Sequence, residues 1–188
     1  FPYTTLFRSD ALYSAEFFPA GRSLYGAGSK GKFKASMSNC YIIDSPADNI
    51  ESIFDTAKKM ARIYSFGGGV GVNISNLRPN EARVNNSAQT SSGAVSFMEL
   101  YNTVGKIIGA SNKKKGETSA RRAALMIGLN CDHPDLEEFL DIKKNNTEIQ
   151  SANISILFTD EFMNAVKNNQ EEHRQRHRER CIDVRCWN

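Results

Sequence analysis

The feature that most constrains the fold of this chain is the direct change from a helical to a strand pattern between residues 45 and 74. The stretch SPADNIESIFDTAKKMARIY begins with a capping-box-like Ser45-x-x-Asp48 and Pro46, which predicts a helix. Its expected inner face carries Ile50, Ile53, Phe54, Ala57, Ala61 and Tyr64. The glycines of SFGGGVGVNISNL then end the helix, and the alternation of Val70, Val72 and Ile74 predicts a strand.

The rest of the chain repeats this alternation of helix and strand. A second helix is predicted over residues 94–108, followed by the polar loop GASNKKKGETSARR. AALMIGLN is typical of a buried strand, and CDHPDLEEFLDIKK of a helix with Pro134 in its first turn. SANISILF predicts another strand, and TDEFMNAV a helix capped by Thr159. This order predicts an α/β fold with a mainly parallel sheet.

Both ends of the chain differ from the middle. Residues 1–9, FPYTTLFRS, have no structural periodicity and resemble the translation of a sequencing-adapter oligonucleotide, so we exclude them from the fold. Residues 171–188 use arginine and no lysine as their basic residue and contain few apolar positions, which predicts a non-native or disordered tail. A charged, exposed helix is the alternative for that tail. The folded domain is therefore expected over residues 10–170.

Composition excludes several classes of function. A net charge of +3 is too small for a nucleic-acid surface, and no apolar run approaches the ~20 residues of a membrane-spanning helix. The four cysteines, Cys40, Cys131, Cys181 and Cys186, form no CxxC pair. Free thiols, a reducing cytoplasm and no metal site are therefore expected.

Four short features are candidates for a functional or a structural role. GGGVG suggests a phosphate loop, but it lacks the GK[ST] ending and enters a strand, so a tight turn is equally compatible. Arg121 and Arg122, between a polar loop and a buried strand, are placed either to bind phosphate or to be solvated. His133, before a proline, is expected to cap or pack. Cys40 follows two polar residues and precedes Tyr41-Ile42-Ile43, which predicts a thiol at the end of a buried strand; a small apolar residue that fills the core is the alternative.

Five motifs follow one another in a fixed order: SNCYIID, DNIESIFDTAKKMARIYSFGGGVGVNISNLRP, SSGAVSFMELYNTV, RRAALMIGLNCDHPDLEEFLDIKK and ANISILFTDEFM. Together they resemble the catalytic large chain of ribonucleotide reductase, in the branch that includes class I and adenosylcobalamin-dependent class II enzymes. The resemblance covers residues 11–166. It implies the N-terminal part of a ten-stranded α/β barrel. It also implies reduction of ribonucleotides to deoxyribonucleotides by thiyl-radical chemistry under allosteric control, with the remaining catalytic residues downstream.

The resemblance also implies roles for individual residues. Cys40 matches a reducing cysteine, and Ser23 and Asn39 match positions beside the substrate's phosphate and sugar. Asp48, Ser65 and Arg78 match the site of a deoxynucleotide or ATP effector, and the loop ending in Arg121 or Arg122 matches the relay to the substrate. The two amphipathic helices would pair with their copies in a homodimer.

The implied reductase needs partners that this chain does not contain. Its radical comes from a metal-containing small subunit or from adenosylcobalamin, neither bound by this segment, and a thioredoxin-like protein restores the thiols. The segment alone is expected to be inactive. Two rivals remain at this point: a catalytically inert nucleotide-sensing dimerisation module, and a monomeric phosphate-binding enzyme that uses GGGVG.

Overall fold

A four-stranded parallel sheet forms the centre of the chain in the computed structural model. The structure describes residues 9–26, 38–85, 87–110, 123–145, 149 and 152–168. The sheet has the order β1-β2-β5-β6, all parallel, with β1 at Cys40–Ile42, β2 at Gly69–Asn73, β5 at Leu125–Asn130 and β6 at Ala152–Leu157. The predicted parallel α/β architecture is confirmed.

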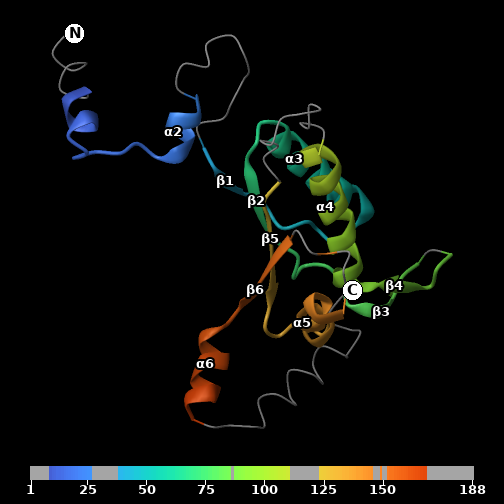
Figure 1. The fold of residues 1–188 in the computed structure, drawn as a ribbon. Helices are drawn as coiled ribbons and strands as arrows, with labels where there is room; N and C mark the ends of the chain where they lie inside the picture. The colour runs from blue at the N-terminus through green and yellow to red at the C-terminus, as the bar shows by residue number, and fades with distance from the viewer. Residues whose placement is uncertain are drawn as a thin grey trace. The chain divides into compact units, whose positions relative to one another are not determined.

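Two long helices lie against one face of this sheet. These are α3 (Ile50–Ser65) and α4 (Gly93–Ala110), which lie side by side in Figure 1. The strand residues beneath them belong to the buried core: Val70, Val72, Leu125, Ile127, Leu129 and Ala152. The alternating residues of the same strands point to the other face, as pleating requires. The core therefore lies between the sheet and the helices.

The start of α3 differs from its prediction. The helix begins at Ile50, and its cap is Asn49, whose side chain accepts a hydrogen bond of 2.8 Å from Ser52 N. The capping box expected from Ser45 to Asp48 is wrong, and Pro46 precedes the helix. The expected inner face is also shifted, because Ile50 and Phe54 are 56% and 54% exposed. Ile53, Ala57 and Tyr64 of the expected face are buried as predicted, and Thr56 and Met60, which were not predicted, are buried with them.

The glycine run after α3 forms a turn and then strand β2. Gly67 has a positive φ of 73°, which ends the helix at little steric cost. A Cβ built on Gly68 would lie 2.8 Å from the Tyr41 ring and 2.6 Å from an Ile63 side-chain carbon. The backbone is therefore covered by side chains, which favours the structural interpretation of GGGVG.

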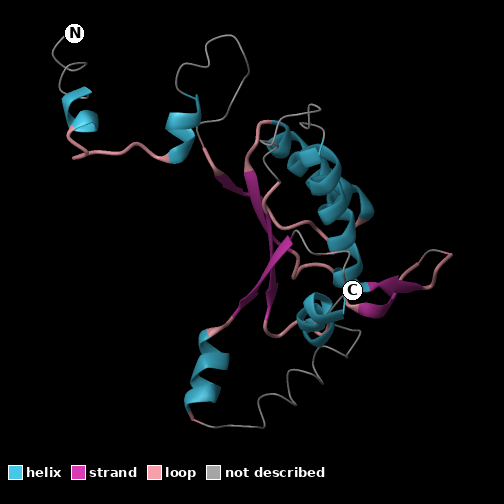
Figure 2. Ribbon diagram, viewed as in Figure 1, coloured by secondary structure: helices cyan, strands magenta, loops and turns pink. Residues whose placement is uncertain are grey.

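The later elements follow the predicted order, with one addition. Helix α5 covers Leu136–Asn145, after Pro134, and α6 covers Asp160–Lys167, with Thr159 accepting a hydrogen bond of 3.2 Å from Phe162 N, as predicted. An antiparallel hairpin, β3 (Asn80–Arg83) with β4 (Thr90–Ser92), was not expected. Figure 2 shows it projecting beyond the sheet.

The segment before Cys40 forms a separate compact unit, Phe1–Asn39. Within it, the structure describes α2 (Gly21–Gly26), where Ser23 N donates a hydrogen bond of 2.8 Å to Ala20 O. None of the helices among the described residues has the length and apolar character needed to cross a membrane.

Candidate functional site

The thiol of Cys40 is free and exposed on the face of the sheet opposite to α3 and α4. Cys40 is the first residue of β1 and pairs with Gly69 of β2. Ile42 shares its face and is 94% exposed, whereas Tyr41 and Ile43 are half-buried. The prediction of a uniformly buried strand is therefore wrong for Ile42. Core filling does not explain Cys40.

We call the surface around Cys40 the open face. The strand register gives its members: Cys40, Ile42, Gly69, Gly71, Asn73, Met126, Gly128, Asn130, Asn153, Ser155 and Leu157. Met126 and Leu157 are 49% and 42% exposed. Cys40 lies at the amino end of its strand, so the rule that chemistry gathers at the carboxyl ends of barrel strands does not support it. A functional role of Cys40 is supported instead by the exposure of its thiol on the open face.

Polar side chains close the carboxyl ends of β2 and β5. Asn73 Nδ2 donates to Asn130 Oδ1 (3.4 Å), and Ser75 N donates to Asn73 Oδ1 (2.9 Å). The Ser75 hydroxyl then accepts a hydrogen bond of 2.8 Å from Asn130 N. The sequence reasoning missed this cluster, although a polar residue directly after each apolar strand was its signal. The cluster fixes the spacing of the two strand ends.

Asp48 and Arg78, predicted for one effector site, lie in direct contact. Arg78 Nε donates to Asp48 Oδ2 at 2.6 Å, and Arg78 N donates to Asp48 Oδ1 at 3.2 Å. Arg78 Nη1 also donates to Arg83 O in β3 at 3.0 Å. The two side chains are 27% and 24% exposed, so the pair is accessible from solvent. A half-exposed guanidinium beside a carboxylate is suited to bind a phosphate and a sugar hydroxyl.

Ser65, the third predicted effector residue, lies far from that pair within one chain. It is the last residue of α3, and its hydroxyl donates to Arg62 O at 2.7 Å. Sixteen helical residues at ~1.5 Å each separate it from Asp48 by roughly 24 Å. The structure therefore does not bring Ser65 to Asp48 and Arg78.

The remaining predicted residues are placed as follows. Ser23 is half-buried in α2, and Asn39 is exposed directly before Cys40; both belong to the separately described unit that ends at Asn39. Arg121 and Arg122 lie outside the described residues.

His133 and Asp135 form a buried hydrogen-bonded group in the turn between β5 and α5. They are 6% and 7% exposed. His133 Nε2 contacts Leu77 O at 2.8 Å, and the Asp135 carboxylate accepts from Asn80 N and Ala94 N, both at 3.0 Å. The prediction that His133 packs or caps is confirmed. Asp135 was not singled out from the sequence.

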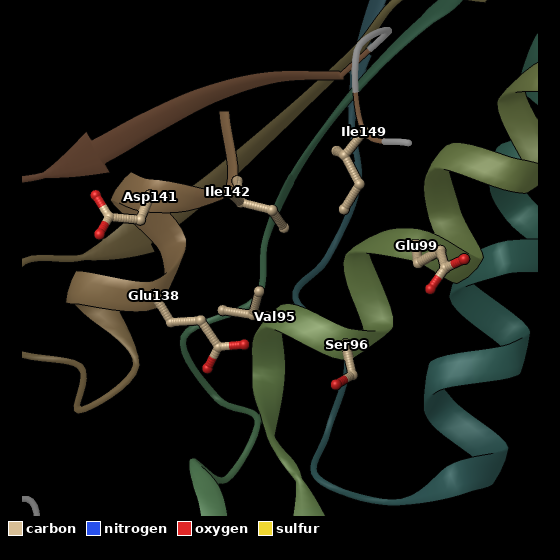
Figure 3. A pocket seen from close by; sticks show the side chains of 7 residues that line it. All are labelled: Val95, Ser96, Glu99, Glu138, Asp141, Ile142 and Ile149. Carbon is tan, nitrogen blue, oxygen red and sulfur yellow. The ribbon is translucent and has the colours of Figure 1, made fainter. Parts of the chain in front are cut away.

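A cavity of about 450 Å³ opens between α4 and α5. Figure 3 shows its lining, which is Val95, Ser96, Glu99, Glu138, Asp141, Ile142 and Ile149. Burial raises the pKa of Glu138, and the nearby Asp135 carboxylate raises it further. In the part of the chain that is described, no group of three or more His, Cys, Asp or Glu side chains is arranged to hold a metal ion. The cavity contains none of the predicted site residues.

Comparison with known proteins gives consistent matches. The family model described as "Ribonucleotide reductase, barrel domain" matches residues 38–178. That match passes residue 170, where composition predicted a boundary, and the boundary stays a prediction.

The relatives are much longer than this chain. The "Vitamin B12-dependent ribonucleoside-diphosphate reductase" of Thermoplasma acidophilum is 34% identical over 160 residues, 85% of this chain and 19% of the relative. The "Ribonucleoside-diphosphate reductase large subunit" of Variola virus is 32% identical over 165 residues, 85% of this chain and 20% of the relative. The chain thus spans about a fifth of the length of these curated relatives.

A solved structure also shares the fold. The "Actinobacillus ureae class Id ribonucleotide reductase alpha subunit" matches with a TM-score of 0.58 at 18% identity, covering 83% of this chain and 26% of that chain.

Proposed function

Because this chain belongs to the ribonucleotide reductase barrel-domain family, we propose that it supplies part of the catalytic barrel of a ribonucleoside-diphosphate reductase. The observation that carries this proposal is the free, exposed thiol of Cys40 on the open face of a parallel sheet. In a closed barrel the helices lie outside and the opposite face of the sheet lines the interior. The open face is therefore the side on which a substrate would be held.

In the proposed reaction, Cys40 acts with a second cysteine as the reductant. Each thiol gives up one hydrogen: one is transferred to the 2′-hydroxyl, which leaves C2′ as water, and the other forms the new C2′–H bond, while the two sulfurs form a disulfide. A thioredoxin-like dithiol then restores both thiols by exchange. Cys131 is an unsuitable partner, because it follows the carboxyl end of β5 whereas Cys40 begins β1. Ser23 and Asn39 are proposed to contact the substrate.

The source of the radical lies outside the described residues in this proposal. The relatives include reductases named as vitamin B12-dependent and a class Id alpha subunit. We propose adenosylcobalamin or a metal-containing small subunit as the radical source.

The pair Asp48 and Arg78 is proposed as the effector site for a deoxynucleotide or ATP. Arg78 supplies a cation for phosphate, and Asp48 supplies an acceptor for a sugar hydroxyl. The two groups now satisfy each other at 2.6 Å, so a bound nucleotide would compete with this ion pair. Arg121 and Arg122 are proposed to relay its presence to the substrate.

A homodimer would reconcile the position of Ser65 with this effector site. If two α3 helices pack antiparallel, Ser65 of one copy comes close to Asp48 of the other. The exposed apolar residues Ile50 and Phe54 of α3, and Ile107 of α4 at 63% exposed, supply a surface for such packing. We propose a cytoplasmic enzyme of this kind.

The deciding experiment compares Cys40→Ser with Cys131→Ser in the full-length reductase that contains this segment. We expect Cys40→Ser to retain its fold and nucleotide binding but to lose multiple turnover with a dithiol reductant, because one reducing thiol is missing. Cys131→Ser, the matched control at the other free cysteine of the described chain, should keep its turnover. Near-wild-type turnover of Cys40→Ser would refute the proposed role. Nucleotide binding without turnover in the unmodified protein would favour a sensing module.

A further inference from the structure

The short segment that carries Arg78 is held on both sides by the turn between β5 and α5. This segment, residues 77–80, covers the end of the connection from β2 and the first residue of the hairpin strand β3. On one side, His133 Nε2 lies 2.8 Å from Leu77 O. On the other side, the Asp135 carboxylate accepts from Asn80 N at 3.0 Å and 3.2 Å. Arg78 therefore lies between two fixed backbone positions.

The hydrogen bonds determine the protonation of this group. Asp135 N donates to His133 Nδ1 at 3.1 Å, so Nδ1 accepts. A carbonyl oxygen only accepts, so Nε2 must carry the hydrogen that points to Leu77 O. The contacts thus require the neutral Nε2–H tautomer of His133. A buried carboxylate with several N–H donors, as Asp135 has, is a rigid anchor for the backbone around it.

We propose that His133 and Asp135 are positioning residues for Arg78 in the nucleotide site. They hold the backbone on both sides of Arg78, so that its guanidinium meets Asp48 and a nucleotide phosphate in one orientation. An arginine side chain loses much conformational entropy when it binds a ligand. If the backbone of Arg78 is already fixed, less entropy is lost on binding. This inference rests on the proposed effector site at Asp48 and Arg78. The site would then depend on a third segment besides those of Asp48 and Arg78, namely the turn of His133 and Asp135, which lies more than 50 residues after Arg78 in the sequence.

The experiment measures the dissociation constant of dTTP for wild type, His133→Leu and His133→Gln, at a temperature where all three are folded. We expect His133→Leu to bind dTTP at least about tenfold more weakly, which corresponds to ~1.4 kcal/mol. His133→Gln should recover most of the affinity, because its side-chain amide keeps a donor toward Leu77 O. Thr159→Ala, which removes the cap of α6, is the control for lost stability and should leave dTTP affinity unchanged.

A double-mutant cycle tests whether the effect passes through Arg78. In an Arg78→Ala background, His133→Leu should cause no further loss of dTTP affinity, whereas additive losses would refute the positioning role. If His133→Leu does not fold, Asp135→Asn replaces it in the same cycle, because it keeps the shape and one acceptor. Unchanged affinity in the folded variants would refute this inference alone. No measurable dTTP binding by wild type would refute the proposed effector site and this inference with it.

Discussion

Replacing Gly93 by alanine tests the most tightly constrained junction of the fold. Gly93 begins α4 with a φ of +82°, and a Cβ there would lie 2.8 Å from Asn80 N and 2.8 Å from Asp135 Oδ2. Forcing an L-residue into this backbone region costs ~1–2 kcal/mol. Relieving the contact moves the Asp135 carboxylate away from Asn80 N and Ala94 N, and each buried donor left unpaired costs ~1–3 kcal/mol.

The strain and the two unpaired donors outweigh the ~0.4–1 kcal/mol gained because alanine loses less entropy on folding than glycine. We therefore expect Gly93→Ala to lower the free energy of unfolding by ~2–7 kcal/mol. Urea denaturation followed by circular dichroism measures this change. Gly105→Ala in the same helix is the matched control, because its Cβ would meet Ala123 Cβ at 3.5 Å and the Tyr64 ring at 3.7 Å, which are ordinary contacts. That control should be neutral or gain up to ~1 kcal/mol of helix propensity. A loss below ~0.5 kcal/mol in Gly93→Ala, within the usual range of surface substitutions, would refute this account of the junction.

Three further predictions concern single side chains. Tyr64 is buried, and its hydroxyl has no hydrogen-bond partner among the described residues. Burial raises the pKa of Tyr64, so this tyrosine ionises at a lower pH in the unfolded chain than in the folded one. The free energy of unfolding should therefore fall as pH rises above ~10. Tyr64→Phe should weaken that fall without lowering the free energy of unfolding at pH 7. Tyr101→Phe should lower the free energy of unfolding by ~1 kcal/mol, because it removes the hydrogen bond of 3.3 Å to Ile53 O. Urea titrations at pH 7 and above pH ~10 measure both effects. Glu81→Gly should raise the thermal midpoint, because Glu81 has a φ of 65° in the β3 bulge, and a lower midpoint would contradict this. Asp48→Ala should weaken dTTP binding by ~1–3 kcal/mol in calorimetry, while Asp55→Ala, at an exposed ion pair within α3, should not.

The sequence predicted the elements whose signal is local. The alternation in β2 and the apolar spacing in α4 both reflect burial of one face, and one face of a strand or helix can be read from a few neighbouring residues. The cap of α6 was also predicted correctly, because the Thr159 hydroxyl and Phe162 N are three residues apart. These features depend on contacts within a single turn or strand.

The features that the sequence missed depend on contacts distant in the chain. The capping signature at Ser45 to Asp48 is plausible locally, but Asp48 binds Arg78, 30 residues away, and Asn49 caps the helix in its place. Hairpin β3–β4 is short and mostly exposed, so its strands show no apolar alternation. Asp135 accepts from two donors that lie 55 and 41 residues away, which no local pattern indicates.

The position of Cys40 illustrates why the face of a strand matters more than its end. Sequence reasoning placed the thiol at a strand end and expected Ile42 to be buried. In the structure, Ile42 and Cys40 point to the same side, and Ile42 is 94% exposed. Burying an isoleucine side chain is favourable by ~1.5–3 kcal/mol, so an apolar residue on this face favours a surface that is covered in the assembled barrel. In the proposed reductase, a thiol on that surface would face the barrel interior and reach a substrate and a second cysteine regardless of which end of the strand it occupies.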